Sequence, residues 1–110
     1  MKELFEKINK KTDLYVGVPD SLLKDFIIEI NKTSKKHIVA TNEGQAVSIA
    51  FGAMLAGKSV WVYLQNSGLG NIINPLTSLC LPSKVFPLLV IGHRHTLPQH
   101  RIMGEIDEQL

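Results

Sequence analysis

Short apolar runs alternate with amphipathic stretches along this chain. Each apolar run holds five or six residues rich in β-branched and aromatic side chains, which is typical of strands. The stretches between them repeat apolar residues at helical spacing, as Leu22, Phe26 and Ile30 do. This alternation predicts an α/β fold with a doubly wound parallel sheet, built in flavodoxin-like order around the first strand. The predicted strands are residues 14–18, 37–41, 59–64 and 87–92, and a last helix is predicted from about residue 99.

Two of these elements are apolar on all sides, which predicts that they are buried. The helix predicted over residues 46–57 shows no continuous polar face and ends at a glycine. The strand 87–92 reads Pro-Leu-Leu-Val-Ile-Gly, a continuous apolar run typical of a strand covered on both faces. Four strands are few for an open sheet of this kind, and they leave one edge uncovered. The sequence therefore predicts a domain that is cut short or is completed by a partner.

Composition and charge are those of an ordinary soluble domain and exclude several classes of protein. The 110 residues suit one domain, with 45% hydrophobic and 20% charged residues. The net charge is +2, and the Lys residues gather at helix ends instead of forming a basic stripe with aromatics, so we expect no nucleic-acid partner. No segment resembles a signal peptide or reaches the roughly 18 apolar residues of a span, so we expect no membrane partner and a cytoplasmic location. A single cysteine, Cys80, excludes an internal disulfide, and its Leu neighbours predict a buried thiol.

The residues with candidate chemistry gather in the turns that follow the predicted strands. Because the carboxyl ends of parallel strands meet at one edge of a sheet, these turns are expected to lie together. They supply acids, amides, hydroxyls and imidazoles, whereas the turns at the opposite edge supply mainly Lys and Ser. This asymmetry predicts a ligand site at the carboxyl edge. The turns are residues 19–21, 42–45, 65–71 and 93–100.

Glu43 and Asp20 are the candidate acids of this edge, and each also has a plainer interpretation. Glu43 stands where a strand ends and a helix begins, so its carboxylate is expected among backbone N–H groups. A first-turn glutamate that only favours the helix dipole would give the same pattern. Asp20 is either the N-cap of the next helix or, if Ser21 caps that helix, available for another role.

The glycine-rich turn over residues 65–71 is a candidate for close backbone approach to a ligand. Gly68 and Gly70 permit such an approach and also permit positive φ. The turn is not a dinucleotide fingerprint, because Ile73 occupies the place of the third glycine and no P-loop lysine follows. A tight buried turn is the alternative interpretation.

The histidines near the end of the chain match no standard zinc spacing. We interpret His93 and His95 as surface loop residues. His100 stands at a predicted helix start, where it could face a ligand and move a proton near neutral pH. Arg94 could bind an anionic substrate as a planar fork, although an exposed loop arginine gives the same pattern.

Four segments together resemble a known enzyme family. They are Gly-Val-Pro-Asp-Ser-Leu-Leu-Lys (17–24), Asn-Glu-Gly-Gln-Ala-Val (42–47), Gln-Asn-Ser-Gly-Leu-Gly-Asn (65–71) and Pro-Gln-His (98–100). In this combination the chain resembles the amino-terminal, pyrimidine-binding half of phosphonopyruvate decarboxylase, a thiamine diphosphate-dependent enzyme. It is also similar to the alpha subunit of sulfopyruvate decarboxylase. The resemblance covers nearly the whole chain, and the segment that begins at residue 65 is its most specific part.

The resemblance implies a role for each residue of the predicted site. Glu43 matches the glutamate that contacts N1′ of the cofactor's aminopyrimidine and exchanges a proton with it. The catalytic set it implies is Glu43, Asp20 and His100. The cofactor-binding set is Glu43, Gly44, Gln65, Asn66, Ser67, Gly68 and Asn71. The substrate-binding set is Asp20, Ser21, Arg94, Gln99 and His100, and no metal ligand is implied in this chain.

Two departures from the family pattern qualify what the resemblance implies. Residues 92–97 are shorter than the corresponding stretch of the family, which leaves the substrate open. The Gly-Asp-Gly…Asn motif for Mg²⁺ and the diphosphate is absent from the sequence. The resemblance therefore implies a partner, a diphosphate-binding domain or subunit, in a homo- or hetero-oligomer. The implied reaction converts phosphonopyruvate to phosphonoacetaldehyde and CO2; sulfopyruvate decarboxylation and a truncated, non-catalytic interaction domain are the alternatives.

Overall fold

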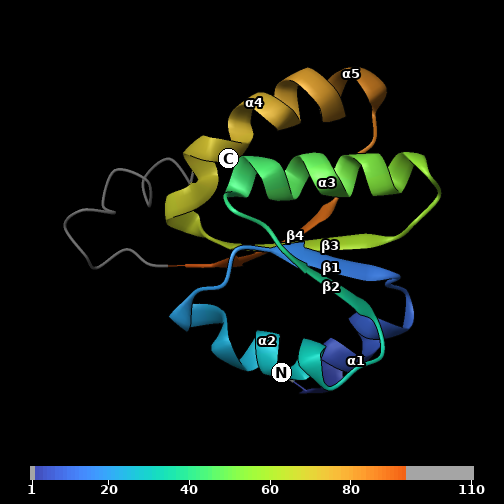
Figure 1. Cartoon of the computed structure of the whole chain (residues 1–110), viewed down its shortest axis with the longest axis vertical. Helices are drawn as coiled ribbons and strands as arrows, with labels where there is room; N and C mark the ends of the chain where they lie inside the picture. Colours follow the sequence, from blue (N-terminus) through green and yellow to red (C-terminus); the bar gives the residue numbers. More distant parts are fainter. Residues whose placement is uncertain (1, 94–110) are drawn as a thin grey trace.

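A computed structural model of the chain describes residues 2–93 (Figure 1). The helix predicted from about residue 99 lies outside the described residues, and so do Arg94, His95, Gln99 and His100. The strands are β1 (Leu14–Gly17), β2 (Lys36–Val39), β3 (Val60–Gln65) and β4 (Leu88–Gly92). The helices are α1 (Lys2–Lys10), η1 (Ser21–Leu23), α2 (Lys24–Asn31), α3 (Glu43–Leu55), η2 (Asn66–Ile72), α4 (Ile73–Pro75), η3 (Leu76–Cys80) and α5 (Leu81–Ser83).

The sheet confirms the predicted topology. Its order is β2-β1-β3-β4, and every neighbouring pair is parallel. One row of side chains crosses the whole sheet, with Val16 opposite Ile38 and Val62, and Val62 opposite Leu89. Helices α1 and α2 lie on one face of the sheet, and α3 with the α4–α5 segment lies on the other (Figure 1). This is the doubly wound α/β arrangement that the alternating pattern predicted.

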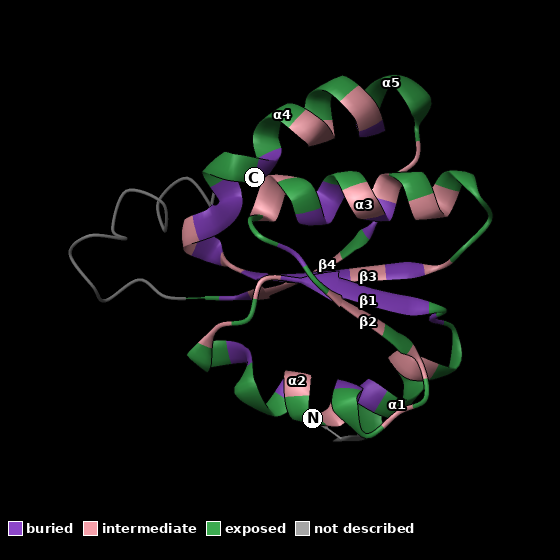
Figure 2. Ribbon diagram, viewed as in Figure 1, coloured by how far each residue is buried: buried purple, intermediate pink, exposed green. Residues whose placement is uncertain are grey.

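Each face of the sheet carries its own buried core (Figure 2). The core beneath α3 is aliphatic, whereas the core beneath α1 and α2 is aromatic. In the aromatic core the ring of Phe26 meets the rings of Phe5, Tyr15 and Tyr63 edge-on, at centroid distances of 5.6 to 6.1 Å. Such edge-to-face pairs add stability beyond the area that they bury.

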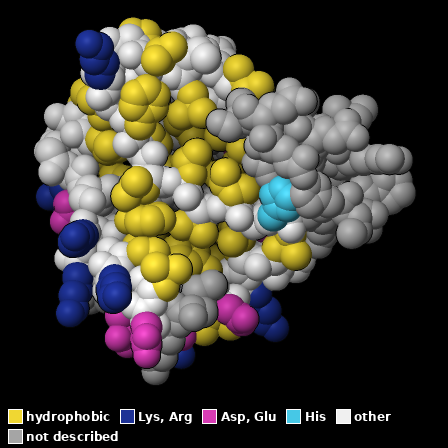
Figure 3. Space-filling model, turned by 180° about the vertical axis from the view of Figure 1, so that it is seen from behind, with side chains coloured by type: hydrophobic (Ala, Val, Ile, Leu, Met, Phe, Trp, Pro, Cys, Tyr) yellow, Lys and Arg dark blue, Asp and Glu magenta, His cyan; other side chains and the backbone are white. Residues whose placement is uncertain are grey.

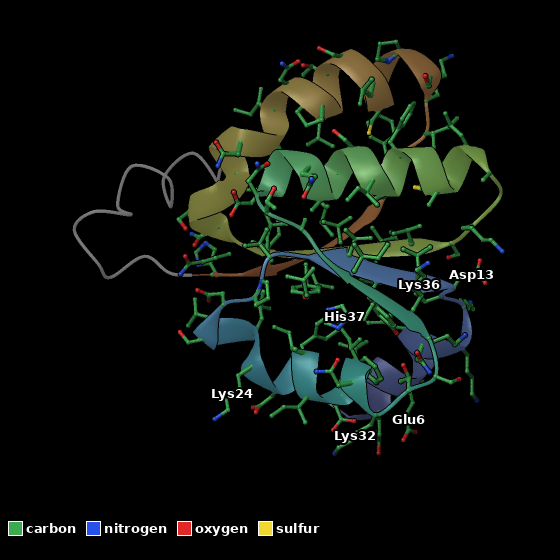
Figure 4. All side chains as sticks on the ribbon, viewed as in Figure 1. Glu6, Asp13, Lys24, Lys32, Lys36 and His37 are labelled. Atoms are coloured by element: carbon green, nitrogen blue, oxygen red, sulfur yellow. The ribbon has the colours of Figure 1, made fainter. Side chains whose placement is uncertain are left out.

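Tyr63 reaches across β1 to contact β2. Gly17 lies opposite Tyr63 in the register of β1 and β3, and a Cβ atom on Gly17 would lie 2.4 Å from the Tyr63 ring. Because Gly17 has no side chain, the ring can cross β1, and the Tyr63 hydroxyl lies 2.6 Å from His37 Nε2. Asn31 Oδ1 lies 3.0 Å from His37 Nδ1 on the other side of the imidazole. Figure 4 shows His37 between the sheet and α2. Since Asn31 Oδ1 accepts, Nδ1 carries the proton and Nε2 accepts from the Tyr63 hydroxyl.

The half-buried His37 should make stability depend on pH. Burial lowers the pKa of His37 below 6.5, whereas the unfolded chain takes up a proton near that value. The unfolded state therefore binds more protons as the pH falls, so the free energy of unfolding should decrease from about pH 7 down through the lowered pKa. Chemical denaturation at a series of pH values would measure the slope. The His37→Gln variant should flatten it, and an unchanged slope in this variant would contradict the expectation.

Two elements are less buried than the sequence predicts. Helix α3 buries only the face with Ala46, Val47 and Ala50, and Leu55 is 62% exposed. Strand β4 was predicted to be covered on both faces, but Leu88 is 54% exposed and the three residues that follow are half-buried. Among the described strands β4 lies at an edge of the sheet, so it has a neighbour on one side only. How far each element is buried depends on which helices and strands pack against it. The local sequence pattern does not specify these neighbours.

Hydrophobic side chains cover much of the face that carries this edge (Figure 3). Phe86 is exposed, and Leu4 is 60% exposed on α1. A hollow of about 270 Å³ lies between the first helix, α2 and the strands β3 and β4. Its lining is Leu4, Phe5, Ile8, Phe26, Trp61, Leu89 and Val90. The uncovered apolar edge that four strands predicted is therefore present in the described part of the chain.

The segment after β3 differs from the turn that the sequence predicts over residues 65–71. Residues Asn66–Ile72 form a 3₁₀-helix, which continues through a short α-helical turn into a π-helical stretch, Leu76–Cys80. Pro75 and Pro82 have no N–H to donate, so a regular α-helix cannot continue through both. Cys80 in this stretch is fully buried, as predicted, and burial raises the pKa of its thiol.

No helix of residues 2–93 combines the length and the apolar character that crossing a bilayer requires.

Candidate functional site

Asn42 and Gln45, and not Glu43, make the side-chain hydrogen bonds that cap the start of α3. Asn42 is the N-cap, and its Oδ1 accepts a hydrogen bond of 2.9 Å from the Gln45 backbone N–H. Gln45 Oε1 in turn accepts from the backbone N–H and the hydroxyl of Thr41, at 2.7 and 2.9 Å. This reciprocal arrangement satisfies backbone donors on both sides of the helix start. The helix therefore does not need the Glu43 side chain as a cap.

The Glu43 carboxylate turns away from its own helix and faces η2. Asn71 Nδ2 donates to Glu43 Oε1 at 2.9 Å. Gly68 lies directly beside the carboxyl group: a Cβ there would be 2.5 Å from Glu43 Cδ and 2.7 Å from Oε2. A Cβ on Gly44 would lie 2.9 Å from the Asn71 backbone oxygen. Four residues of the predicted cofactor-binding set therefore meet at one place: Glu43, Gly44, Gly68 and Asn71.

Gly68 in η2 serves a close approach between two elements. The close backbone approach that Gly68 permits is to the side chain of Glu43. Neither Gly68 nor Gly70 uses the positive φ that glycine permits, because among the described glycines only Gly57 has positive φ. Gly57 follows the C-cap of α3, where left-handed backbone is common. A 3₁₀-helix keeps φ negative, so position 68 needs glycine for space and not for backbone freedom.

Gln65, Asn66 and Ser67 lie at the carboxyl end of β3. Gln65 is opposite Gly92 in the sheet, and its Oε1 accepts a 2.6 Å hydrogen bond from the Ser67 hydroxyl. Gln65 Nε2 is buried and has no hydrogen-bond partner in the part of the chain that the structure describes. Asn66 is fully buried. A buried amide nitrogen without a partner is uncommon and calls for a ligand, a water or another group to accept from it.

Asp20 and Ser21 lie at the same edge of the sheet but below the other face. Asp20 Oδ2 accepts a 2.8 Å hydrogen bond from the Leu22 backbone N–H, so Asp20 is the N-cap of η1. It also lines an open hollow of about 370 Å³ with Ser21 and Lys24. A Cβ on Gly92 would meet Leu22 at 3.3 Å, so η1 packs against the end of β4. The capping interpretation of Asp20 is confirmed, and its catalytic role stays a prediction.

The opposite edge of the sheet differs in character. Figure 4 shows Asp13 and Lys36 near the amino ends of the strands, away from the start of α3. Asp13 Oδ2 accepts from the Ser59 N–H at 2.8 Å, and Lys35 Nζ donates to the Thr12 carbonyl at 2.7 Å. These groups bond to loop backbone and so connect the chain segments there. Among residues 2–93, no three His, Cys, Asp or Glu side chains gather as they would around a metal ion.

The sequence did not identify two contacts of this site. The cap formed by Asn42 and Gln45 follows the known spacing of a cap residue and Glu or Gln three positions later, so the pattern could have been recognised. The hydrogen bond between Glu43 and Asn71 joins positions 28 residues apart. No local pattern specifies such a contact, because it depends on how η2 packs on α3.

The chain is similar to two kinds of curated protein, phosphonopyruvate decarboxylase and the alpha subunit of sulfopyruvate decarboxylase. The phosphonopyruvate decarboxylase of Streptomyces viridochromogenes is 40% identical over 102 residues, which cover 86% of this chain and 25% of that protein. The sulfopyruvate decarboxylase subunit alpha of Methanocaldococcus jannaschii is 39% identical over 88 residues, which cover 79% of this chain and 52% of that protein. The same subunit of Methanothermobacter thermautotrophicus is 27% identical over an alignment that covers 91% of this chain and 73% of that protein.

These relatives confirm the resemblance that the four sequence segments indicated. The chain spans about a quarter of the first relative and about half of the second. No model of a protein family matches the chain.

Proposed function

We propose that this chain supplies the pyrimidine-binding part of a thiamine diphosphate-dependent 2-oxoacid decarboxylase. The observation that carries the proposal is the position of the Glu43 carboxylate. It stands at a helix start that Asn42 already caps, and it faces η2, where Gly68 leaves the space beside it free of a side chain. A first-turn glutamate that serves only the helix dipole has no need of that arrangement.

The residues present suit the aminopyrimidine end of the cofactor. That ring offers a nitrogen that can exchange a proton with a carboxyl group, which Glu43 supplies. The ring also offers an amino group and a further ring nitrogen, for which the amide of Gln65 and the backbone of η2 are candidate partners. The unpartnered Nε2 of Gln65 supports this assignment, because a buried donor is costly unless something accepts from it.

The chain's own residues have separate tasks in the proposed reaction. When bound, thiamine diphosphate supplies the nucleophilic carbon and takes up the electron pair released with CO2. Glu43 holds and returns the proton at the pyrimidine nitrogen, a general acid–base role. Asp20, at the end of β1, is proposed to act at the substrate's keto group together with His100, and Gln65 to Asn71 form the wall against which the ring packs.

The charged end of the cofactor requires groups from elsewhere. Mg²⁺ prefers carboxylate, amide and phosphate oxygens in octahedral geometry. The described residues contain no carboxylate cluster that could provide this coordination. We therefore propose that a diphosphate-binding domain or subunit completes the site. The subunit names of the sulfopyruvate decarboxylase relatives support an enzyme assembled from more than one chain.

Phosphonopyruvate is the proposed substrate, and sulfopyruvate is the second candidate. Both are three-carbon 2-oxoacids that differ in the terminal anionic group, so the same carbonyl chemistry serves either. The identity of 40% to one relative and 39% to the other does not separate them. Arg94 is the proposed contact for the terminal group.

Reconstitution with a partner tests the proposal. The purified chain alone should release no CO2 from either oxoacid, because its sequence lacks the Gly-Asp-Gly…Asn motif for Mg²⁺ and the diphosphate. Addition of thiamine diphosphate, Mg²⁺ and a chain that carries the diphosphate-binding motif should produce turnover, and comparing the two oxoacids should identify the substrate. Turnover by the chain alone would contradict the division of the site. A complex that forms but neither binds thiamine diphosphate nor releases CO2 would indicate a non-catalytic interaction domain.

A further inference from the structure

We propose that Asn71 is a positioning residue that holds the Glu43 carboxylate without fixing its charge. The inference rests on the proposed function, in which Glu43 must both give up and take back a proton. It concerns a side chain that the resemblance assigned to cofactor binding. The structure places the Asn71 amide on the glutamate itself.

The packing around Glu43 confines its carboxylate from two sides. Asn71 Nδ2 bonds Oε1 at 2.9 Å, and within the described residues it is the only hydrogen-bond partner of the carboxylate. The backbone of Gly68 lies against Cγ, Cδ and Oε2, where any side chain would displace the carboxyl group. The Asn71 backbone is in turn held close to Gly44, whose missing side chain makes room for the Asn71 carbonyl. Oε1 is therefore held in place by the Asn71 amide, and the carboxyl group has little room to move toward Gly68.

An amide is suited to a carboxyl group that changes its protonation state. It donates through its nitrogen to a carboxylate, and after rotation by about 180° it accepts through its oxygen from a carboxylic acid. A lysine or arginine at position 71 would favour the ionised form of Glu43 alone. An aspartate would place two carboxylates in contact, and one of them would then retain a proton to a higher pH. Asparagine keeps the hydrogen bond in both states and favours neither charge.

Three variants separate this role from a purely structural one. Asn71→Leu has a similar size but no polar group, and Asn71→Asp has the same shape with a negative charge. Asn74→Asp is the matched control: it adds the same charge one turn further along, where the Asn74 side chain accepts from Ser78 instead of contacting Glu43. Positions 71 and 74 are both exposed, so the three proteins should fold.

The first measurement needs no cofactor. Carbon-13 NMR of the Glu43 carboxyl group, recorded against pH in the full chain, should show its titration midpoint moving up by about one pH unit in Asn71→Asp. Asn74→Asp should move the midpoint much less. Equal midpoints in the two aspartate variants would show that the contact is absent in solution, which would overturn the proposal.

The second measurement uses the assembled enzyme. Asn71→Leu should slow exchange of the cofactor's C2 proton by roughly 10- to 100-fold, the cost typical of losing a residue that orients a reacting group. Thiamine diphosphate affinity should fall less than the exchange rate, because Glu43 remains although the wall formed by residues 65–71 is altered. Exchange at the wild-type rate in Asn71→Leu would overturn the positioning role even if the NMR shift is seen. If Glu43→Gln also exchanges at the wild-type rate, the proposed function itself fails, and the NMR result still reports on the contact.

Discussion

Replacement of Glu43 by Gln in the assembled enzyme should lower the decarboxylation rate by about 10² to 10⁴, the range typical of general acid–base residues. The amide keeps the shape of the side chain and can still bond a ring nitrogen, but it cannot exchange the proton. Binding of thiamine diphosphate should therefore weaken far less than turnover. Steady-state kinetics over a range of cofactor concentrations would separate the two effects.

Asp20→Asn is the matched comparison for Glu43→Gln. Asp20 is proposed to act on the substrate, so its variant should slow turnover while exchange of the cofactor's C2 proton for deuterium stays near the wild-type rate. Glu43→Gln should slow both. Because the Asp20 carboxylate also caps η1, thermal melting of Asp20→Asn should be recorded alongside. Unchanged C2 exchange in Glu43→Gln would mean that Glu43 is only a first-turn carboxylate of α3.

Replacement of Gly17 by Ala should destabilise the fold by about 1–3 kcal/mol, the usual cost of overpacking a core. The added methyl group would lie 2.4 Å from the fully buried ring of Tyr63. The Tyr63 ring cannot move aside freely, because the Phe26 ring packs edge-on against it at a centroid distance of 6.1 Å. The Tyr63 hydroxyl is also hydrogen-bonded to His37. For a domain of this size, such a loss lowers Tm by several degrees per kcal/mol, which calorimetry or circular dichroism would detect.

Gly52→Ala provides the control of opposite sign. Gly52 lies inside α3, and a Cβ there would meet nothing within 4 Å. Alanine should therefore stabilise the helix by about 0.5–1 kcal/mol, because it costs less backbone entropy than glycine. If both variants lowered Tm equally, the loss in Gly17→Ala would not report on Tyr63.

The fold class was predictable because it follows from patterns that neighbouring residues carry. Apolar runs of strand length alternate with helical spacing, and chain chirality then leaves few topologies, of which the observed β2-β1-β3-β4 order is one. The ends of elements were less predictable. Helix α3 begins at Glu43, three residues before the predicted start, because Asn42 caps it. Strand β2 spans Lys36–Val39 instead of residues 37–41.

The candidate site was likewise predictable in its location but not in its side-chain contacts. Glu43, Asp20 and the segment from Gln65 to Asn71 were predicted as neighbours because each follows a strand, and parallel strands bring those positions to one edge. The side-chain contacts were not predictable. Whether Asp20 or Ser21 caps η1, and whether Asn71 faces a ligand or Glu43, depends on competition among hydrogen-bond partners that only the packed structure resolves.

The sequence by itself determined the layers, the strand order and the edge of the sheet at which the polar residues gather. It could do so because local periodicity and chain direction set these features. The tertiary structure alone decided the contact of Tyr63 with His37 across Gly17, the exposure of β4 and the confinement of Glu43 between Gly68 and Asn71. These features join residues on different elements, and their geometry depends on how closely the elements pack, a quantity that no single segment of sequence carries.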